Sequence, residues 1–359
     1  MDRGFISATS YVVEPTECYA ERLDKKYRSL APRIEQTSNG EDMVVIPGMD
    51  DPTPLSLLTH GRTAQFADVP SGGWNPKQRI ADQEREGIAA EILFPTLALR
   101  LCQHSDGDYK RACFEAYNQW LQEYCSAAPG RLFGIGLTAV TSVDEAIQDV
   151  QQAKERGFVG ILLPGFPQGE DYDDAAYTAL WKCAADLGLP VHIHALGSPE
   201  HDLLRHRCSS NFYGTFNVSR NCQDVVALFV MSHAFEQVPS LKLITVQADA
   251  SWMPHLSGRM MHYYEVHGFY LGAHNLEQPP SYYLRENVYM TLLDDWAAFG
   301  LKSELNMQRL LWGSHFPQGD SYWPESRETL EPGLSQLNEE EKSWFLRDNS
   351  VELYGLPLH

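Results

Sequence analysis

Near its C-terminal end the chain reads Leu310-Leu311-Trp312-Gly313-Ser314-His315-Phe316-Pro317-Gln318. The apolar run Leu310–Trp312 predicts a buried strand, and Gly313-Ser314 predicts the loop that follows it. In a barrel of alternating strands and helices, catalytic side chains lie where a strand meets its following loop. His315 stands at this junction, so it is the first candidate for a catalytic group.

Seven further apolar runs of strand length precede this one, and several are continuous, as parallel strands buried on both faces should be. The eight predicted strands are Phe5–Ala8, Ala90–Pro95, Phe133–Val140, Val159–Leu163, Val191–Ala195, Leu243–Gln247, Val288–Leu292 and Leu310–Gly313. Amphipathic segments that predict helices separate them: Pro76–Glu86, Tyr109–Ala127, Val143–Arg156, Asp173–Leu187, Gln223–Val238 and Trp252–Val266. This alternation predicts a (β/α)₈ TIM barrel. A doubly wound sheet is disfavoured, because no Gly-x-Gly-x-x-Gly follows the first strand.

Length and composition fit one domain over residues 1–359. The chain is 43% hydrophobic and carries a net charge of −20, which argues against nucleic acid or an anionic membrane as a partner. No apolar run reaches membrane-spanning length, and the N-terminus lacks the apolar core of a signal peptide. Seven cysteines without a Cys-x-x-Cys pair suggest free thiols in the cytoplasm. The expected partners are a small-molecule substrate and, at most, a second copy in a homodimer.

A long segment rich in Pro, Thr, Ser and Gly follows the first predicted strand. It covers residues 40–73 and reads as an insertion loop. In a barrel, a loop after the first strand lies over the catalytic face. We therefore expect it to form a lid.

Further motifs resemble the amidohydrolase-related barrel enzymes, the branch that includes aminocarboxymuconate-semialdehyde decarboxylase and the aromatic acid decarboxylases. The resemblance covers nearly the whole chain in the order of the family. Its motifs are Ile6–Pro15, Gly130–Gly136, Gly160–Gly165, Leu189–His194, Phe235–Leu243, Trp252–Pro254 and Asp348–Leu356. It implies an amidohydrolase-like TIM barrel with its active site at the carboxyl ends of the strands.

The metal ligands of that family do not carry over. Relatives begin with an Asp-x-His or His-x-His pair, and those positions here are Thr9 and Tyr11. The histidine of strand five is retained as His194. The ligand of strand six falls on Gln247, and the aspartate of strand eight falls on His315. A histidine that often follows in relatives falls on Gln318. Neutral hydroxyls and amides are poor ligands beside imidazole and carboxylate, so we expect no metal and no cofactor.

Three interpretations follow. In the first, which we favour, the chain is a metal-independent enzyme that works by acid–base chemistry in the inherited pocket. In the second, it is a metal-dependent decarboxylase or hydrolase with a rearranged ligand set of His192, His194 and His315, with Glu14 as a further candidate. In the third, it is a non-catalytic pseudoenzyme that binds a small molecule.

The favoured interpretation assigns a role to each candidate residue. Imidazole titrates near neutral pH, so His315 and His194 are candidate acids and bases. The hydroxyl of Tyr11 could stabilise an oxyanion or fill the space left by the ion, Glu14 could orient a histidine, and Asp249 could act as a base. The predicted substrate-binding residues are Thr9, His192, Gln247, Phe166, Trp74, Phe316 and Gln318. The cluster His201, Arg205, His206 and Arg207 reads as a solvated loop, with an anion clamp as the alternative.

The aromatic side chains around the expected mouth suit a cyclic or aromatic ligand. The predicted function is lyase-type chemistry on a small organic molecule: decarboxylation, dehydration or hydration, or cyclisation. Hydrolysis is less expected, because no group would lower the pKa of an attacking water.

Overall fold

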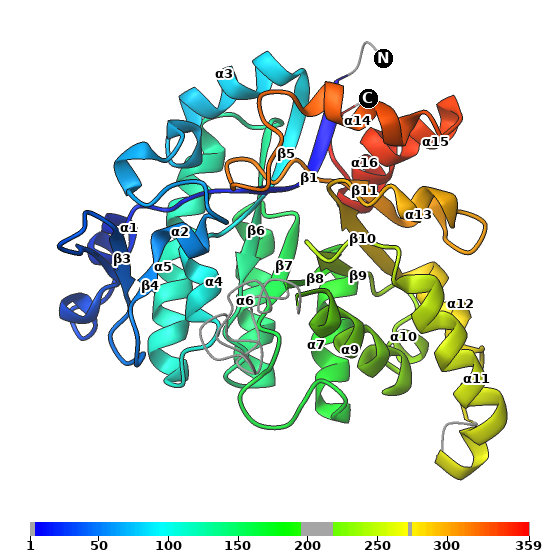
Figure 1. Cartoon of the computed structure of the whole chain (residues 1–359). Coiled ribbons are helices and arrows are strands. Elements are labelled where there is room, and N and C mark those ends of the chain that lie inside the picture. The colour runs from blue at the N-terminus through cyan, green and yellow to red at the C-terminus, as the bar shows by residue number, and fades with distance from the viewer. Residues whose placement is uncertain (1–3, 195–217, 272–274, 359) are drawn as a thin grey trace.

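A computed structural model describes residues 4–194, 218–271 and 275–358. Eight parallel strands form one sheet in the order β1-β5-β6-β7-β8-β9-β10-β11. They are β1 (Phe5–Tyr11), β5 (Ile88–Phe94), β6 (Leu132–Leu137), β7 (Gly160–Leu163), β8 (Val191–His194), β9 (Leu243–Val246), β10 (Val288–Leu292) and β11 (Leu310–Trp312). The predicted barrel is confirmed (Figure 1).

The segment after β11 closes the barrel onto β1. The amide of His315 donates to the carbonyl of Thr9 at 3.0 Å, and the amide of Tyr11 donates to the carbonyl of Phe316 at 2.8 Å. A side chain at Gly313 would come within 2.8 Å of the Thr9 Cβ, so only glycine allows this close approach. The closure therefore fixes His315 against the end of the first strand.

Helices surround the strands on the outside of the barrel (Figure 1). The longer ones are α3 (Pro76–Glu86), α5 (Gly107–Ser126), α6 (Val143–Glu155), α7 (Thr178–Asp186), α9 (Val218–Met231), α11 (Met253–Leu271), α12 (Pro280–Asn287) and α14 (Ser326–Leu334). Helix α3 begins as its sequence predicts: the Asn75 side chain accepts from the amides of Lys77 and Gln78. Gly157 and Gly188, which follow α6 and α7, have φ of 78° and 63°, the left-handed geometry that ends a helix.

The strands are buried on both faces. Every residue of β1, β7, β8, β9, β10 and β11 is buried. Burial on both sides explains why the runs are continuously apolar. Polar side chains within them therefore lie in the barrel interior or at its rim, where they must find partners.

The segment 40–73 carries more secondary structure than the expected loop. It contains β3 (Asp42–Val45), β4 (Thr53–Pro54) and α2 (Leu55–Leu58), and β2 (Arg33–Gln36) completes a small antiparallel sheet with β3 and β4. The carbonyl of Thr59 accepts from the amide of Gly319 at 2.9 Å. The end of α2 is therefore held against the loop that follows His315. Its role as a lid stays a prediction.

Among the described residues, no helix combines the length and the apolar character needed to cross a bilayer.

Candidate active site

Four predicted site residues meet at the carboxyl ends of their strands. Tyr11 ends β1, His194 ends β8, Gln247 follows β9, and His315 lies three residues after β11. The Tyr11 hydroxyl lies 2.9 Å from His194 Nε2 and 2.9 Å from Gln247 Oε1. The rings of Tyr11 and His315 meet edge to face at 6.1 Å. The structure therefore brings these four side chains into one cluster.

Asp320 and His60 complete this cluster. The Asp320 Oδ2 atom accepts from His315 Nδ1 at 2.9 Å and from Gln247 Nε2 at 3.0 Å. The His60 Nδ1 atom lies 3.1 Å from Gln247 Nε2 and 3.4 Å from Asp320 Oδ1. The segment 40–73 thus supplies one side chain, His60, to the site.

The chemistry of each group fixes the direction of these hydrogen bonds. Ionised Asp320 only accepts, so the Gln247 nitrogen must face it and the Gln247 oxygen must face Tyr11. The single hydroxyl hydrogen of Tyr11 is then donated to Gln247. Consequently His194 Nε2 carries a hydrogen and donates it to the Tyr11 oxygen. The same Gln247 nitrogen lies 3.1 Å from His60 Nδ1, which accepts from it in the tautomer where that nitrogen carries no hydrogen.

His315 presents its second nitrogen to the barrel interior. Its Nδ1 donates to Asp320, whereas its buried Nε2 has no hydrogen-bond partner among the described residues. The backbone of His315 adopts φ of 56°, a conformation that L-residues rarely take. Gln247 and Asp249 also have positive φ, at 59° and 58°. Strain of this kind gathers at functional sites, where the surrounding structure maintains it.

Burial and charge set the protonation states around this imidazole. Burial alone would raise the pKa of Asp320, but the charge and hydrogen bond of His315, with His60 nearby, lower it well below its usual range. Burial, followed by the neighbouring His60 and His315, lowers the pKa of His194 to about 3. His194 is therefore neutral near pH 7, as its donor role to Tyr11 requires. Burial, followed by the charge of Asp320, raises the pKa of the Tyr11 hydroxyl well above its ordinary value.

Asp249 lies on the side of the site toward β10. Burial, followed by repulsion from Asp295, raises the pKa of its carboxyl to about 6, and the charge of His315 opposes this rise. Asp295 itself accepts from the amides of Ala250 and Ser251 at 3.0 and 2.6 Å. Asp249 is thus poised to change its charge just below neutral pH.

Two predicted residues lie apart from the cluster. Glu14 is buried, and its carboxylate accepts from the amides of Thr96 and Ala98 and from the hydroxyl of Tyr19. His192 is also buried and lies two residues before His194 on β8. Its Nδ1 is 3.0 Å from the carbonyl of Ile161, and its Nε2 is 2.9 Å from the Tyr354 hydroxyl. The contacts of both residues are those of groups that stabilise the barrel wall.

The remaining predicted binding residues are divided between the barrel rim and its exterior. Thr9 is buried at the barrel closure, and no described residue is a hydrogen-bond partner of its Oγ1. Phe316 is buried, and the centre of its ring lies 4.7 Å from the guanidinium carbon of Arg79. The ring therefore points into the protein rather than toward His315. Trp74 and Phe166 are exposed.

Gln318 connects the loop after β11 to the segment 40–73. In the orientation that gives both the amide nitrogen and the amide oxygen of Gln318 a hydrogen-bond partner, the nitrogen donates to the carbonyls of Leu58 and Thr59 at 3.2 Å. The oxygen accepts from the Thr96 hydroxyl at 2.8 Å. This residue therefore positions the loop that carries His315 and Asp320.

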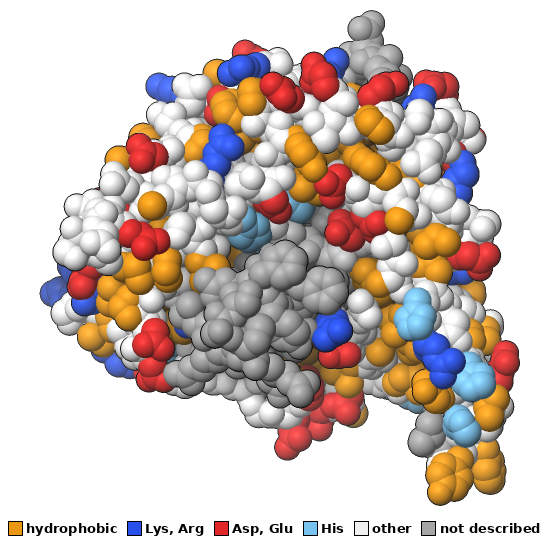
Figure 2. Space-filling model, viewed as in Figure 1, with side chains coloured by type: hydrophobic (Ala, Val, Ile, Leu, Met, Phe, Trp, Pro, Cys, Tyr) orange, Lys and Arg blue, Asp and Glu red, His pale blue; other side chains and the backbone are white. Residues whose placement is uncertain are grey.

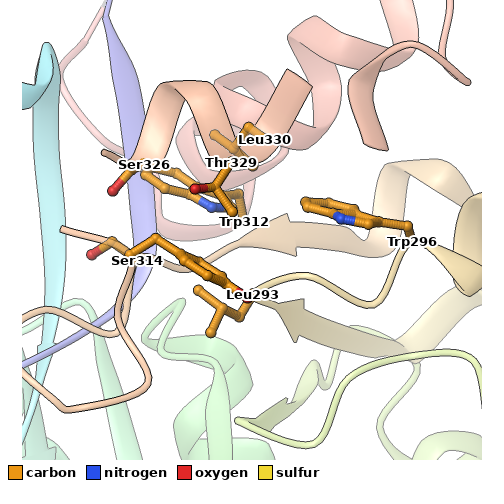
Figure 3. Close-up of a pocket in the computed structure, with 8 residues that line it drawn as sticks. Leu293, Trp296, Trp312, Ser314, Ser326, Thr329 and Leu330 are labelled. Atoms are coloured by element: carbon orange, nitrogen blue, oxygen red, sulfur yellow. The ribbon is translucent and has the colours of Figure 1, made fainter. Parts of the chain in front are cut away.

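A small cavity lies behind this loop, between β10, β11 and α14 (Figure 3). Figure 3 shows Trp312, the last residue of β11, and Trp296, in the loop after β10, facing it, with Ser314 at its edge. The lining residues are Leu293, Trp296, Trp312, Ser314, Tyr322, Ser326, Thr329 and Leu330. The cavity is mainly apolar. Ser314, the residue before His315, lines it, whereas His315 is not among its lining residues.

The sequence analysis missed Asp320 and His60. Asp320 lies five residues after His315, in a turn where Gln318 donates its amide to the His315 carbonyl at 2.8 Å. A carboxylate shortly after a candidate catalytic histidine is a signal that could have been used. His60 has no such signal, because its contact depends on how the segment 40–73 folds back. The predicted cluster His201, Arg205, His206 and Arg207 lies outside the described residues.

The donor set of this cluster does not fit a metal ion. Tyr11 stands where relatives place a ligand, and its hydroxyl takes the Nε2 hydrogen of His194, which leaves that nitrogen no lone pair for an ion. Asp320 is turned toward imidazole and amide donors. Within residues 4–194, 218–271 and 275–358, no group of three His, Cys, Asp or Glu side chains is arranged to hold a metal.

Comparisons with known proteins identify one matching family and three similar proteins. A family model described as Amidohydrolase matches residues 55–356. The protein named Decarboxylase orsB, from Emericella nidulans, is 22% identical over 299 residues, which are 76% of this chain and 84% of the relative. An amidohydrolase from Mycobacterium avium subsp. paratuberculosis shares the fold with a TM-score of 0.81 and 19% identity, over 99% of this chain and 100% of the relative.

A 5-carboxyvanillate decarboxylase from Novosphingobium aromaticivorans, whose structure contains manganese, is also similar. Its TM-score is 0.70 at 18% identity, over 98% of this chain and 97% of the relative. At this level of identity the likeness establishes the fold alone.

Proposed function

Because the chain belongs to the amidohydrolase family, we propose that it is a lyase that removes the carboxyl group of a small aromatic or cyclic acid. Two of the similar proteins are named decarboxylases. The site supports this proposal through one observation: His315 has its Nδ1 fixed by Asp320, while its buried Nε2 is directed into the barrel without a described partner.

The geometry suits proton delivery to a carbon atom. Asp320 stabilises the protonated imidazole, because an ionised carboxylate 2.9 Å away favours the positive charge. In the proposed step, Nε2 gives its proton to the ring carbon that bears the carboxylate. The carbon–carbon bond then breaks, its electron pair returns to the ring, and carbon dioxide leaves. Neutral His315 regains a proton before the next turnover.

We propose that this reaction proceeds without a resident metal ion. The support is chemical. The Tyr11 hydroxyl is hydrogen-bonded to Gln247 and His194, and the Asp320 carboxylate accepts hydrogen bonds from His315 and Gln247, so these groups already have partners. The manganese in the similar 5-carboxyvanillate decarboxylase favours metal-dependent decarboxylation as the second candidate. Removing metal ions from the protein separates the two.

The test uses the reverse proton transfer, which needs no knowledge of the natural acid. Phenols are incubated with the protein in D₂O, and ring-hydrogen exchange is followed by NMR; hydroxylated benzoates and 5-carboxyvanillate are assayed in parallel for carbon dioxide release. His315→Asn should lower both rates by about 10²–10⁴-fold, the usual contribution of a positioned acid or base. His255→Asn, which changes an exposed imidazole, is the matched control.

Full exchange by His315→Asn would exclude His315 as the proton donor. If the wild-type protein bound the acids but catalysed neither ring-hydrogen exchange nor carbon dioxide release, the non-catalytic interpretation would be favoured.

A further inference from the structure

Residues 59–62 form a turn directly after helix α2, closed by a hydrogen bond from the Arg62 amide to the Thr59 carbonyl; we call it the His60 turn. It lies against the loop after β11, whose Gly319 amide donates to the carbonyl of Thr59 at 2.9 Å. A side chain at Gly319 would come within 2.1 Å of the His60 carbonyl oxygen and 2.8 Å of the Arg62 amide nitrogen. Because both neighbours are backbone atoms, this close contact needs glycine.

From this turn the His60 side chain reaches two polar groups of the site. Its Nδ1 atom lies 3.1 Å from Gln247 Nε2 and 3.4 Å from Asp320 Oδ1. Without a hydrogen, Nδ1 accepts from the Gln247 amide; with a hydrogen, it donates to the Asp320 carboxylate. Both arrangements tie the turn to the two side chains that stand beside His315.

One oxygen of the Asp320 carboxylate depends on this imidazole. The Oδ2 atom accepts from His315 and Gln247, whereas no described residue is a hydrogen-bond partner of the buried Oδ1 atom, which His60 Nδ1 approaches at 3.4 Å. A buried carboxylate oxygen without a nearby donor is costly. Without the imidazole, the carboxylate would therefore be more stable turned toward water and away from His315.

Solvent is within reach for such a movement. The side chains of His60 and Asp320 are 21% and 34% exposed, whereas that of His315 is 4% exposed. Histidine and acidic side chains meet near the middle of the face shown in Figure 2. The Asp320 carboxylate thus lies between a buried imidazole, which it must face, and water, which competes for it.

We propose that His60 is a positioning residue for proton transfer to the substrate. Its imidazole keeps the Asp320 carboxylate turned toward His315, and that hydrogen bond directs Nε2 of His315 into the barrel. His60 acts through Asp320 and needs no contact with the reacting atoms. Docking of the His60 turn and readiness of His315 are then one event, because one side chain serves both. This inference deepens the proposed function and rests on it.

The backbone of His60 determines which variants test this role. Its φ is 51°, in the left-handed region. His60→Gly removes the imidazole without backbone strain, because glycine adopts this geometry freely. His60→Asn places an amide near the position of Nδ1, and asparagine also tolerates this geometry. The two variants therefore differ in the polar group and not in the strain of the turn.

Proton NMR of the full chain with isotope-labelled histidine gives a readout that needs no substrate. The Nδ1 hydrogen held between His315 and Asp320 should exchange slowly with water and give a downfield signal, which His315→Asn removes. His60→Gly should make this hydrogen exchange at least about tenfold faster, and His60→Asn should retain it. A wild type without the signal, or a His60→Gly protein with unchanged exchange, would overturn the proposal.

Turnover, measured as ring-hydrogen exchange of phenols in D₂O, gives the second readout. His60→Gly should lower kcat by about 10–10²-fold and leave KM nearly unchanged, because His60 acts on the proton donor rather than on substrate binding. Gly319→Ala should cause a similar loss, since the added Cβ separates the His60 turn from the loop after β11. Gly300→Ala, whose added Cβ has no atom within 4 Å, is the matched control.

The double variant of His60→Gly and Gly319→Ala tests whether both changes act through the same contact. It should be no slower than the slower single variant, whereas losses that multiply would overturn the proposal. Equal melting temperatures exclude unfolding as the cause. A wild type that shows the expected NMR signals but exchanges no ring hydrogen would reject the proposed function and still support the positioning of His315 through His60.

Discussion

Arg79 and Glu91 form a two-pronged ion pair inside the wall of the barrel. The Arg79 Nε and Nη2 atoms donate to the Glu91 carboxylate at 2.6 and 2.9 Å, and both side chains are buried. The same guanidinium donates to the carbonyl of Tyr11 at 2.8 Å and reaches the carbonyl of Phe316 at 3.4 Å. One buried cation thus holds the backbone of both segments that carry the site.

Breaking this pair should destabilise the fold strongly. Arg79→Ala leaves the Glu91 carboxylate buried without its cation, and such a loss costs about 3–5 kcal/mol. Urea denaturation should show this decrease in the free energy of unfolding. Arg33→Ala, which removes an exposed ion pair with Glu35, should leave it nearly unchanged. An Arg79→Ala protein as stable as the wild type would mean that Glu91 takes up a proton at little cost.

The Tyr11 hydroxyl should matter more for stability than for turnover. Tyr11→Phe leaves the Gln247 oxygen and the His194 Nε2–H without their partner, which costs about 1–3 kcal/mol for buried groups. Because its hydrogen is already donated to Gln247, we expect turnover to change less than tenfold. Thermal melts and steady-state kinetics on Tyr11→Phe measure the two effects. A fall in turnover of about 10²–10³-fold would instead show that the hydroxyl stabilises charge on the substrate.

Asp249 should make the protein more stable at low pH than at neutral pH. Its pKa is raised to about 6 in the folded state, against about 3.9 in an unfolded chain. The folded state therefore holds the extra proton between these values, and its advantage is lost as the pH rises through 6. Asp249→Asn should thus raise the free energy of unfolding at pH 7.5 by up to about 3 kcal/mol, seen as a higher melting temperature, and change both little at pH 4. Equal shifts at both pH values would assign the effect to packing.

Metal removal should leave the protein intact. Since Tyr11, Gln247 and Asp320 satisfy one another, dialysis against a chelator should alter neither the melting temperature nor the rate of ring-hydrogen exchange. Elemental analysis of the freshly purified protein should find no near-stoichiometric zinc or manganese. Loss of exchange on chelation, with recovery on adding manganese, would establish the metal-dependent alternative.

The barrel could be predicted because its signals are local. All eight predicted strands coincide with strands of the structure, and the range Val288–Leu292 agrees at both ends. The match to the amidohydrolase family over residues 55–356 confirms the resemblance. The range Gln223–Val238 reads as one helix, but the structure divides it into α9 and α10 (Ala234–Gln237) at His233, whose φ of 65° is incompatible with a continuous helix. A single left-handed histidine has no periodic signature, so the break was not visible.

The site was predictable only where strand ends determine it. Tyr11, His194, Gln247 and His315 meet because parallel strands end at the same rim of a barrel. Asp320 and His60 join them through long-range contacts between the loop after β11 and the segment 40–73. No periodicity encodes such contacts. Phe316 was expected beside the substrate, but the turn after His315 directs its ring onto Arg79.

The amide of Gln247 separates the cluster into two halves that cannot exchange protons. A hydroxyl, an imidazole or a water can accept a proton on one side and release it on the other, whereas the nitrogen and oxygen of an amide keep their fixed roles. Gln247 stands between the Tyr11–His194 pair and the Asp320–His315 pair. It therefore acts as an insulator in what would otherwise be a proton wire across the barrel. A proton lost from His315 Nε2 must be replaced from the substrate side or from solvent, which ties the rate of recharging to the opening of the barrel mouth.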